Sequence, residues 1–316
     1  GKLENGTLTA HPLYGAYLIT EYLFLYNRKE ESVYLKAAIK VAEATLYKME
    51  YVKKYDALAF YYTEDTALTY YPGKFISALT QARYMVPFYN LYNLTGETKF
   101  KVAADRIFNS LKIPQSDGGV LIKTSFGIAV EEYPHDIPTF VLNGWTTVIL
   151  ELLKYHEKSG NKKVLDFAMK NISTAESVLN KYDYPQLFLS RYQLTGFAYV
   201  KLIFSKSQNA KITKFETMVD GKFYGLKDTN NRWSNFLLTK EQDENGFAKK
   251  KKLQVNGVFS QINDSQKINI EIECNDADSV KIYIANGSYN PQVSSMLTKR
   301  WILLKHENLK KGLNKI

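Results

Sequence analysis

The sequence predicts a mainly α-helical fold: an (α/α) toroid of helical hairpins, followed by a C-terminal all-β, sandwich-like domain. Three observations in the 316 residues predict this fold class. One helical-hairpin junction recurs three times, long Tyr-rich connections separate the hairpins, and the apolar period changes from helical to alternating after about Ser207. We therefore expect a toroidal domain at residues 1–207 and an accessory β-domain at residues 208–316.

The repeated junction appears when the chain is aligned with itself. The segment LYNRKEESVYLKAA (Leu25–Ala38) aligns without gaps on LYNLTGETKFKVAA (Leu91–Ala104), and YHEKSGNKKVLDFA (Tyr155–Ala168) is a looser third copy. In each copy an apolar helix ends in aromatic residues, a short polar turn follows, and a second helix begins, as in toroids and α-solenoids. The helices are expected at His11–Asn27, Ser32–Met49, Phe75–Leu94, Thr98–Leu111, Thr139–Ser159, Lys162–Lys181 and Gln193–Phe204.

Two connections between the hairpins are long, Tyr51–Gly73 and Lys112–Pro138. The second contains the alternating run GGVLIKTSFGIAVEEY, which predicts a small β-hairpin. Long loops inside a compact helical repeat are usually functional or disordered, and a patterned, Tyr-rich loop favours function. Both leave from the same end of the hairpins, which in a toroid is the rim of the cavity. We therefore expect one site formed by Tyr61, Tyr62, Tyr70, Tyr71, Glu131, Glu132, Tyr133 and the segment near Tyr184.

The C-terminal third reads as strands separated by Asn, Asp, Gly and Ser turns. Its alternating segments include KITKFETMV, KKKLQVNGVFS, KINIEIEC and DSVKIYIAN. The single cysteine, Cys274, lies in one of these runs and is expected in a strand; alone, it excludes an internal disulfide and a cysteine-cluster metal site. We find no ligand constellation here, so an accessory packing or glycan-binding role is expected.

Composition and charge narrow the function classes. The chain is 45% hydrophobic with 24 Tyr and 17 Phe, as in an ordinary globular protein. Its net charge of +10 favours an acidic partner such as a uronate polysaccharide, nucleic acid or an anionic surface. The apolar runs are shorter than the roughly 20 residues that span a bilayer, so no membrane span is expected. The localisation stays open. One option is that the protein is secreted or lies in the cell envelope after its signal peptide has been removed.

Motifs for metals and nucleotides are absent from the sequence. The four histidines are scattered without HExxH or paired ligand spacing. No GxGxxG follows a predicted strand, and there is no GxxxxGK[ST]. No metal and no cofactor are therefore expected.

The strongest candidate for a catalytic segment is EEYPHDIPTFVLNG, at Glu131–Gly144. It places two carboxylates, a phenol and a histidine directly before an apolar helix, where a rim loop can present acid and base groups. The same pattern also fits a polar loop capped onto a helix. Gly144 is expected to allow close helix packing, and Asp136 to cap the helix entry or shape substrate preference.

Together with PGKFISALTQARYMVPFYNLYNLTGETKF (Pro72–Phe100), this segment resembles the C-terminal catalytic domain of heparosan D-glucuronyl 5-epimerases. That family has an EEYP segment before a P..FVLNG helix start and an upstream PG(W)YSAMAQ-like helix. The upstream motif is matched by Pro72, Gly73, Ser77, Ala78 and Gln81. The resemblance covers roughly Pro72–Phe204 and implies an (α/α) toroid. It also implies an isomerase that inverts carbon 5 of a uronate in an acidic polysaccharide or oligosaccharide, with no nucleic acid partner.

The resemblance carries roles onto individual residues. It makes Glu132 and Tyr133 the candidates for proton transfer. The family's later segment YD...IYDLRH...WDYH corresponds to NKYDYPQLFLSRYQLTGFAYVKLIF, in which the family's catalytic tyrosine falls near Phe188 and WDYH is absent. A second catalytic phenol is therefore expected from Tyr184 or Tyr192, with Tyr199 as a further candidate. The substrate-binding residues are expected to be Gln81, Arg83, Glu131, His135, Asn143, Arg191 and Tyr199.

Three other functions fit the same sequence. A uronate lyase needs one base and one acid around a differently placed leaving group. A glycoside hydrolase would use a pair of carboxyls from Glu131, Glu132 and Asp136. A non-catalytic glycan-binding protein would keep the aromatic residues without a convergent acid and base.

Overall fold

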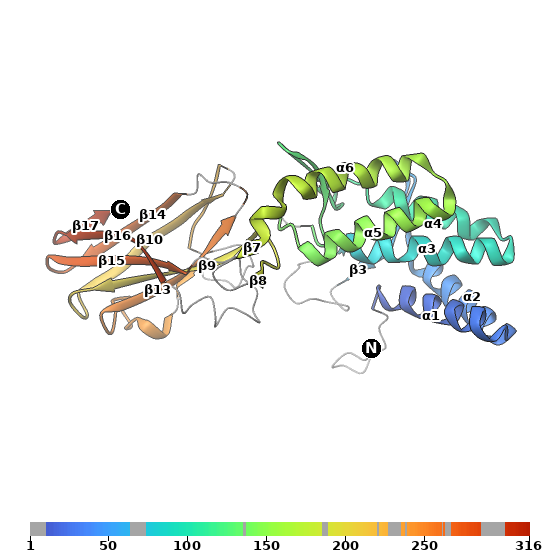
Figure 1. The fold of residues 1–316 in the computed structure, drawn as a ribbon. Coiled ribbons are helices and arrows are strands. Elements are labelled where there is room, and N and C mark those ends of the chain that lie inside the picture. The colour runs from blue at the N-terminus through green and yellow to red at the C-terminus, as the bar shows by residue number, and fades with distance from the viewer. Residues whose placement is uncertain are drawn as a thin grey trace. The chain divides into compact units, whose positions relative to one another are not determined.

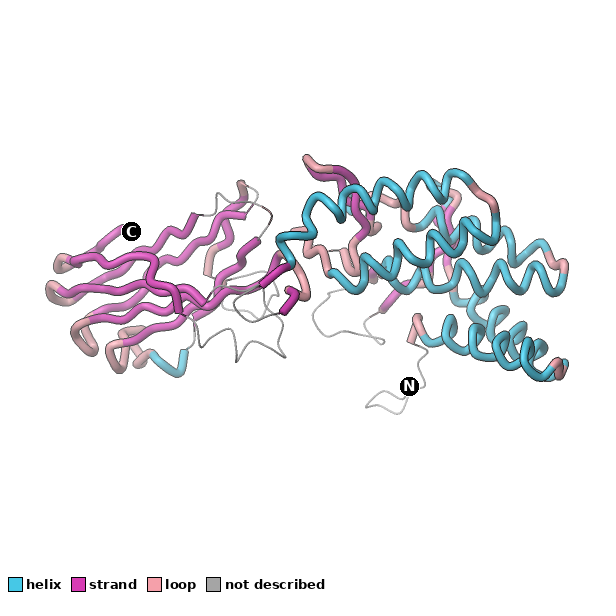
Figure 2. The backbone as a smooth tube through the Cα atoms, viewed as in Figure 1, coloured by secondary structure: helices cyan, strands magenta, loops and turns pink. Residues whose placement is uncertain are grey.

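The structure of the chain is a computed structural model. The chain folds into two compact units, Gly1–Leu179 and Asn180–Ile316 (Figure 1). The first unit is built mainly of helices and the second of strands (Figure 2). The structure describes residues 11–63, 74–134, 137–184, 189–219, 221–226, 235–237, 239–260, 262, 267–285 and 301–316.

In the described part of the first unit, six α-helices form three hairpins. They are α1 (Tyr14–Lys29) with α2 (Ser32–Lys48), α3 (Ala78–Thr95) with α4 (Thr98–Ser110), and α5 (Leu142–Ser159) with α6 (Lys162–Val178). Helix α3 packs against both α1 and α5, so the first helices of the hairpins form one row. The predicted helical hairpins are confirmed, and the closed toroid stays a prediction. Within the described ranges, no helix is long and apolar enough to cross a bilayer.

The repeated sequence junction corresponds to one recurring helix ending. At the end of each first helix a residue takes the left-handed conformation, with φ of 56° at Glu30, 71° at Gly96 and 65° at Gly160. The backbone N–H of this residue donates a hydrogen bond to the carbonyl four residues earlier, with an N–O distance of 2.8 Å in each case. Glycine adopts this conformation without strain, which explains its place in two of the three copies.

Short strands organise the connections between the hairpins. Strand β1 (Glu50–Val52) pairs with β2 (Ala57–Ala59), and β3 (Tyr61–Tyr62) pairs with β4 (Phe75–Ile76). The predicted hairpin within Lys112–Pro138 is confirmed, because β5 (Leu121–Thr124) pairs with β6 (Gly127–Val130). Strand β4 ends directly before α3, and the chain leaves β6 at Glu131, so both connections deliver their residues to the start of a helix.

The second unit consists of antiparallel sheets, which confirms the all-β expectation for the C-terminal region. One sheet has the order β11-β10-β14-β17 and another β12-β13-β9-β15-β16, and both contribute to a single hydrophobic cluster that includes Phe204, Phe215 and Ile272. Cys274 is buried in β14, as expected for a strand residue. The strands are β7 (Asp183–Tyr184), β8 (Leu189–Ser190), β9 (Thr195–Phe204), β10 (Ala210–Val219), β11 (Lys222–Tyr224), β12 (Phe236–Leu237), β13 (Lys252–Ser260), β14 (Lys267–Cys274), β15 (Asp278–Ala285), β16 (Trp301–Leu309) and β17 (Gly312–Lys315).

The helix predicted at Gln193–Phe204 is wrong. This segment forms β9, with Ala198, Val200, Leu202 and Phe204 directed into the core of the sheets. The side-chain period is therefore two, which is the period of a strand. As a consequence, the division between the compact units lies between Leu179 and Asn180, N-terminal to the boundary predicted after residue 207.

Candidate active site at the helix N-termini

The N-terminal ends of α1, α3 and α5 gather at the end of the first unit where the connections enter. The His11 ring stacks on Tyr14 of α1, with centroids 4.7 Å apart, and lies edge-on to Tyr62 at 5.3 Å. The Tyr62 hydroxyl is hydrogen-bonded to Thr80 Oγ1 in the first turn of α3, at 2.7 Å. Helix N-termini carry the positive end of the peptide dipoles, so this end of the unit favours an anionic ligand.

Glu132 lies against the first turn of α5, in contact with Gly144. A methyl group placed on Gly144 would come within 2.4 Å of Glu132 Oε2, 2.8 Å of its Cβ and 2.9 Å of its Cδ. Only glycine leaves room for the carboxyl here, and the Glu132 residue is 7% exposed. Gly144 therefore serves the close approach of Glu132, and the expectation that it serves helix packing is corrected.

Three aromatic rings pack together near Glu132. The Tyr62 and Phe75 rings stack with centroids 5.0 Å apart, and the half-buried Tyr133 meets Phe75 edge to face at 6.0 Å. Burial, followed by the negative charge of Glu132, raises the pKa of Tyr62 to about 12, against the opposing hydrogen bond from Thr80. Tyr62 is therefore a neutral phenol near pH 7, able to donate a proton or hydrogen bond.

Glu131 holds the loop rather than facing a substrate. It is fully buried, and its Oε2 accepts hydrogen bonds from the Thr139 backbone N–H at 3.0 Å and the Thr139 hydroxyl at 2.5 Å. Its Oε1 accepts a hydrogen bond from the Phe140 backbone N–H at 2.9 Å. Phe140 has a positive φ of 52°. Burial raises the pKa of Glu131 to about 7, although these three donors lower it. The predicted substrate contact of Glu131 is corrected to a structural clamp.

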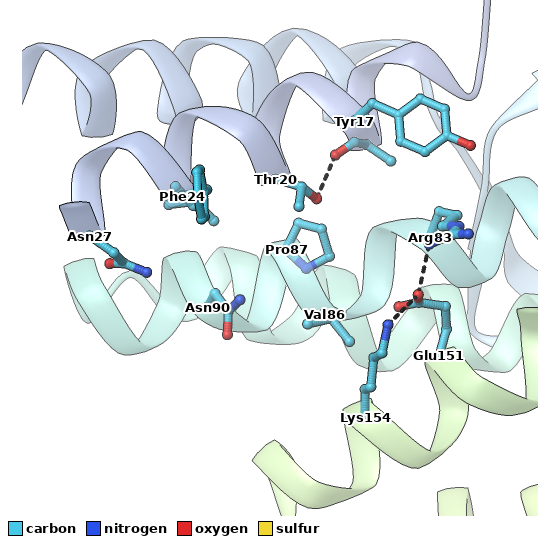
Figure 3. A pocket seen from close by; sticks show the side chains of 12 residues that line it. Tyr17, Thr20, Phe24, Asn27, Arg83, Val86, Pro87, Asn90, Glu151 and Lys154 are labelled. Atoms are coloured by element: carbon cyan, nitrogen blue, oxygen red, sulfur yellow. Dashed lines mark hydrogen bonds and ion pairs between the residues drawn. The ribbon is translucent and has the colours of Figure 1, made fainter. Parts of the chain in front are cut away.

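Gln81 and Arg83, both expected to bind substrate, have different surroundings. The fully buried Gln81 accepts from the Phe60 backbone N–H through Oε1 at 3.0 Å and donates to the Phe60 carbonyl through Nε2 at 2.9 Å. Gln81 thus fixes the connection before β3, and its predicted role in substrate binding is corrected. Arg83, on another side of α3, binds Glu151 at 3.0 Å and lines a groove (Figure 3).

The other candidates of the first unit lie at the start of α5 or outside the described residues. Asn143 is exposed in the first turn of α5. His135, Asp136, Tyr70 and Tyr71 lie outside the described residues. In the part of the chain that the structure describes, no three His, Cys, Asp or Glu side chains are grouped so that they could hold a metal ion.

Tyr184, Arg191, Tyr192 and Tyr199 belong to the second unit. The backbone of Tyr184 pairs with Leu189 between β7 and β8. The backbone N–H of the half-buried Arg191 donates to the Tyr182 carbonyl at 2.6 Å, and Tyr192 is exposed. Tyr199 is a half-buried residue of β9. Their participation in the site stays a prediction.

Sequence reasoning placed Glu132 and Tyr133 at the rim but missed the residues that hold this rim together. Thr80 binds the Tyr62 hydroxyl, and Thr139 and Phe140 supply the donors that bind Glu131. The signal for Gly144 was present in the sequence, since a glycine in the first turn of a helix permits close approach of another group. The two threonines and Phe140 carry no comparable signal, because their partners are known only in the folded chain.

The chain belongs to the family described as D-glucuronyl C5-epimerase C-terminus, whose match covers residues 53–218, just over half of the 316 residues. The match includes the rim strands β3 and β4, helix α3 and the Glu131–Gly144 segment. It continues through β9 into β10.

More distant similarities were also found. An uncharacterized protein of Methanocaldococcus jannaschii is 29% identical over 110 residues, which are 34% of this chain and 36% of that protein. The match thus spans about a third of the length of this curated relative. A GH76 alpha-mannanase from Bacteroides thetaiotaomicron has a TM-score of 0.38 at 16% identity, over 53% of this chain and 44% of that chain. A D-mannose isomerase has a TM-score of 0.41 at 12% identity, over 55% and 42%. Both TM-scores are too low to support an inference about fold or activity.

Proposed function

We propose that the chain acts on a uronate-containing polysaccharide or oligosaccharide as a glucuronyl 5-epimerase. The carboxyl of Glu132, held against the first turn of α5 beside Tyr133, is the observation that carries the proposal. The family match and the net charge of +10 support it. We further propose that the helical hairpins form part of an (α/α) toroid, and that the two sheets are a sandwich-like accessory domain.

The reaction requires a base and an acid on opposite faces of the sugar ring. In the proposed mechanism, Glu132 removes the proton from carbon 5, and the electrons of the C5–H bond move into the sugar carboxylate to form an enolate. A phenol then delivers a proton to carbon 5 from the other face, which forms the new C5–H bond. Tyr133, in the same unit as Glu132, is the phenol proposed for this step. Solvent exchange restores the starting protonation states of the carboxyl and the phenol.

The helix N-termini supply the charge stabilisation that this chemistry needs. The enolate carries one more negative charge than the sugar portion had before proton removal. Fixed positive dipole ends aimed at developing charge lower the barrier, because they need no reorganisation during the reaction. We propose this role for the N-terminal ends of α1, α3 and α5.

Glycoside hydrolysis receives less support from the geometry. That reaction uses two carboxyl groups that both face the sugar. Glu131 is fully buried and binds three donors of Thr139 and Phe140, so the pair Glu131 and Glu132 does not supply them.

Incubation with a heparosan-like glucuronate polymer in heavy water tests the proposal. We expect deuterium at carbon 5 and the appearance of the C5 epimer, measured by NMR and mass spectrometry of the digested polymer. A new ultraviolet-absorbing double bond would instead indicate a lyase, and shortened chains a hydrolase. Binding of the polymer without deuterium incorporation would indicate a glycan-binding module. Each of these last three results contradicts the proposal.

A further inference from the structure

A groove of about 290 Å³ runs between α1, α3 and α5, farther along the same helices that form the rim (Figure 3). Helix α1 contributes Tyr17 and Phe24, α3 contributes Arg83 and Asn90, and α5 contributes Lys154. Its volume lies near the lower end of the range of small-molecule sites, roughly 300–1,000 Å³. This size suits one or two sugar residues.

Positive charge exceeds negative charge in the groove. Arg83 Nη1 and Lys154 Nζ both contact a single carboxylate oxygen, Glu151 Oε1, at 3.0 Å and 3.2 Å (Figure 3). Glu151 itself is buried, so two cations share one carboxylate. In addition, Arg83 Nε is buried and has no hydrogen-bond partner among the described residues. The Arg83 side chain is 33% exposed, so an oxyanion in the groove can reach the accessible part of its guanidinium and balance the second positive charge.

The remaining walls combine aromatic faces with polar groups. Tyr17 and Phe24 are 46% and 50% exposed, so both rings present accessible surface beside the groove. The Arg83 guanidinium carbon lies 5.9 Å from the centre of the Tyr17 ring. Pro87 has no N–H, so it cannot donate to the Arg83 carbonyl one turn earlier in α3. A sugar ring offers an apolar face for the aromatic rings and hydroxyls for such polar groups.

We infer that this groove is a subsite for a sugar residue that carries a carboxylate or sulfate, bound through Arg83. The sugar is part of an oligosaccharide whose reacting residue lies at the Glu132 rim. That this oligosaccharide is the substrate rests on the proposed function. The binding of an anionic sugar in the groove stands independently of any turnover.

Isothermal titration calorimetry of the full chain with a heparosan-type hexasaccharide tests the inference. We expect Arg83→Gln to weaken binding by at least about 10-fold, because hydrogen bonds to a charged group are among the stronger ones. Arg106→Gln is the matched control, because Arg106 also pairs with a carboxylate, Asp56 at 2.9 Å, and lies over a tyrosine ring, Tyr51 at 4.7 Å, but is outside the groove. The control should bind like the unchanged protein.

Further arms keep the test decisive. Tyr17→Ala removes an exposed ring, so it should leave the fold intact, and it should weaken binding as well if the groove is occupied. An O-sulfated hexasaccharide compared with the unsulfated one distinguishes sulfate from carboxylate as the preferred anion, and a neutral glucan hexasaccharide should bind more weakly than both. Unchanged affinity in both Arg83→Gln and Tyr17→Ala, or an equal loss in Arg106→Gln, overturns the subsite. If the protein catalyses deuterium exchange and Arg83→Gln binds the hexasaccharide as tightly as the unchanged protein, the subsite is refuted and the epimerase proposal is not. If binding depends on Arg83 but no exchange occurs, the epimerase proposal is refuted and the subsite is not.

Discussion

Gly144→Ala should separate activity from stability, because the added methyl group strikes the carboxyl of Glu132. The new Cβ would lie 2.4 Å from Oε2, whereas ordinary contacts between heavy atoms are about 3.5 Å, so the carboxyl must retreat by about 1 Å. A displacement of about 1 Å in a reacting group can cost about 100-fold in rate. Alanine at the same time favours the helix by about 1 kcal/mol relative to glycine. We therefore expect a loss of about 100-fold in C5 exchange, with the free energy of unfolding changed by no more than about 2 kcal/mol.

The assay pairs the rate of deuterium incorporation at carbon 5 with urea unfolding of the same preparations. Gly160→Ala is the control, because Gly160 has a φ of 65° and no atom within 4 Å of its added Cβ. This variant should lose about 1 kcal/mol of stability through backbone strain and keep its exchange rate. If Gly144→Ala kept the full exchange rate, the placement of Glu132 against α5 would have no catalytic meaning, and our reasoning would be refuted.

Three further substitutions test the residues around the rim. Glu131→Gln should flatten the pH dependence of the free energy of unfolding between about pH 4.5 and 7. The pKa of the Glu131 carboxyl is raised to about 7 in the folded chain, so its contribution to stability is complete below pH 4.5 and is lost as the pH rises through 7. Urea unfolding at several pH values measures this slope. Gln81→Leu leaves the Phe60 backbone N–H and carbonyl without their partner and should cost about 2–5 kcal/mol of stability, measured by thermal unfolding. Tyr62→Phe removes the hydrogen bond to Thr80 and should cost about 1 kcal/mol, while the stacked ring and most of the exchange rate remain; an exchange rate reduced as far as in a Glu132 variant would make Tyr62 the proton donor.

The helical hairpins could be predicted because their signal is local. The apolar period marks each helix, and the residues that end the first helices, Gly96 and Gly160, recur at the same place in the repeat. Even Glu30, which carries no such signal by itself, takes the same left-handed conformation as its two counterparts. The hairpin of β5 and β6 was predictable for the same reason, since alternation and a turn are both visible in the sequence.

Strand β9 lies where a helix was predicted, at Gln193–Phe204. The run from Ala198 to Phe204 alternates between core and outer positions and is rich in aromatic and β-branched residues, which favour a strand. Its pairing partners, β13 and β15, lie far away in the sequence, so no local pattern identifies them. A helix and a buried strand both present apolar runs, and only the long-range pairing decides between them.

The candidate site stays a prediction, and the contacts of its individual residues could not be predicted from the sequence. Glu131 and Glu132 are neighbours with the same chemistry, yet one binds the backbone donors of the α5 entry and the other lies against Gly144. Gln81 was expected at the substrate, and its amide instead matches the backbone of Phe60. Which side of a loop faces a helix depends on the tertiary packing, and the sequence spacing alone does not contain it.

The loss of label from carbon 5 tests the central claim most directly. A glucuronate polymer deuterated at carbon 5 is incubated in ordinary water with the unchanged protein, with Glu132→Gln, and with Glu157→Gln, whose carboxyl lies on the exposed surface of α5. Acid–base groups contribute about 100- to 10,000-fold to such reactions. We predict that Glu132→Gln slows the loss of deuterium by at least about 100-fold while Glu157→Gln matches the unchanged protein. An unchanged rate in Glu132→Gln, in a protein that remains folded, would contradict the account.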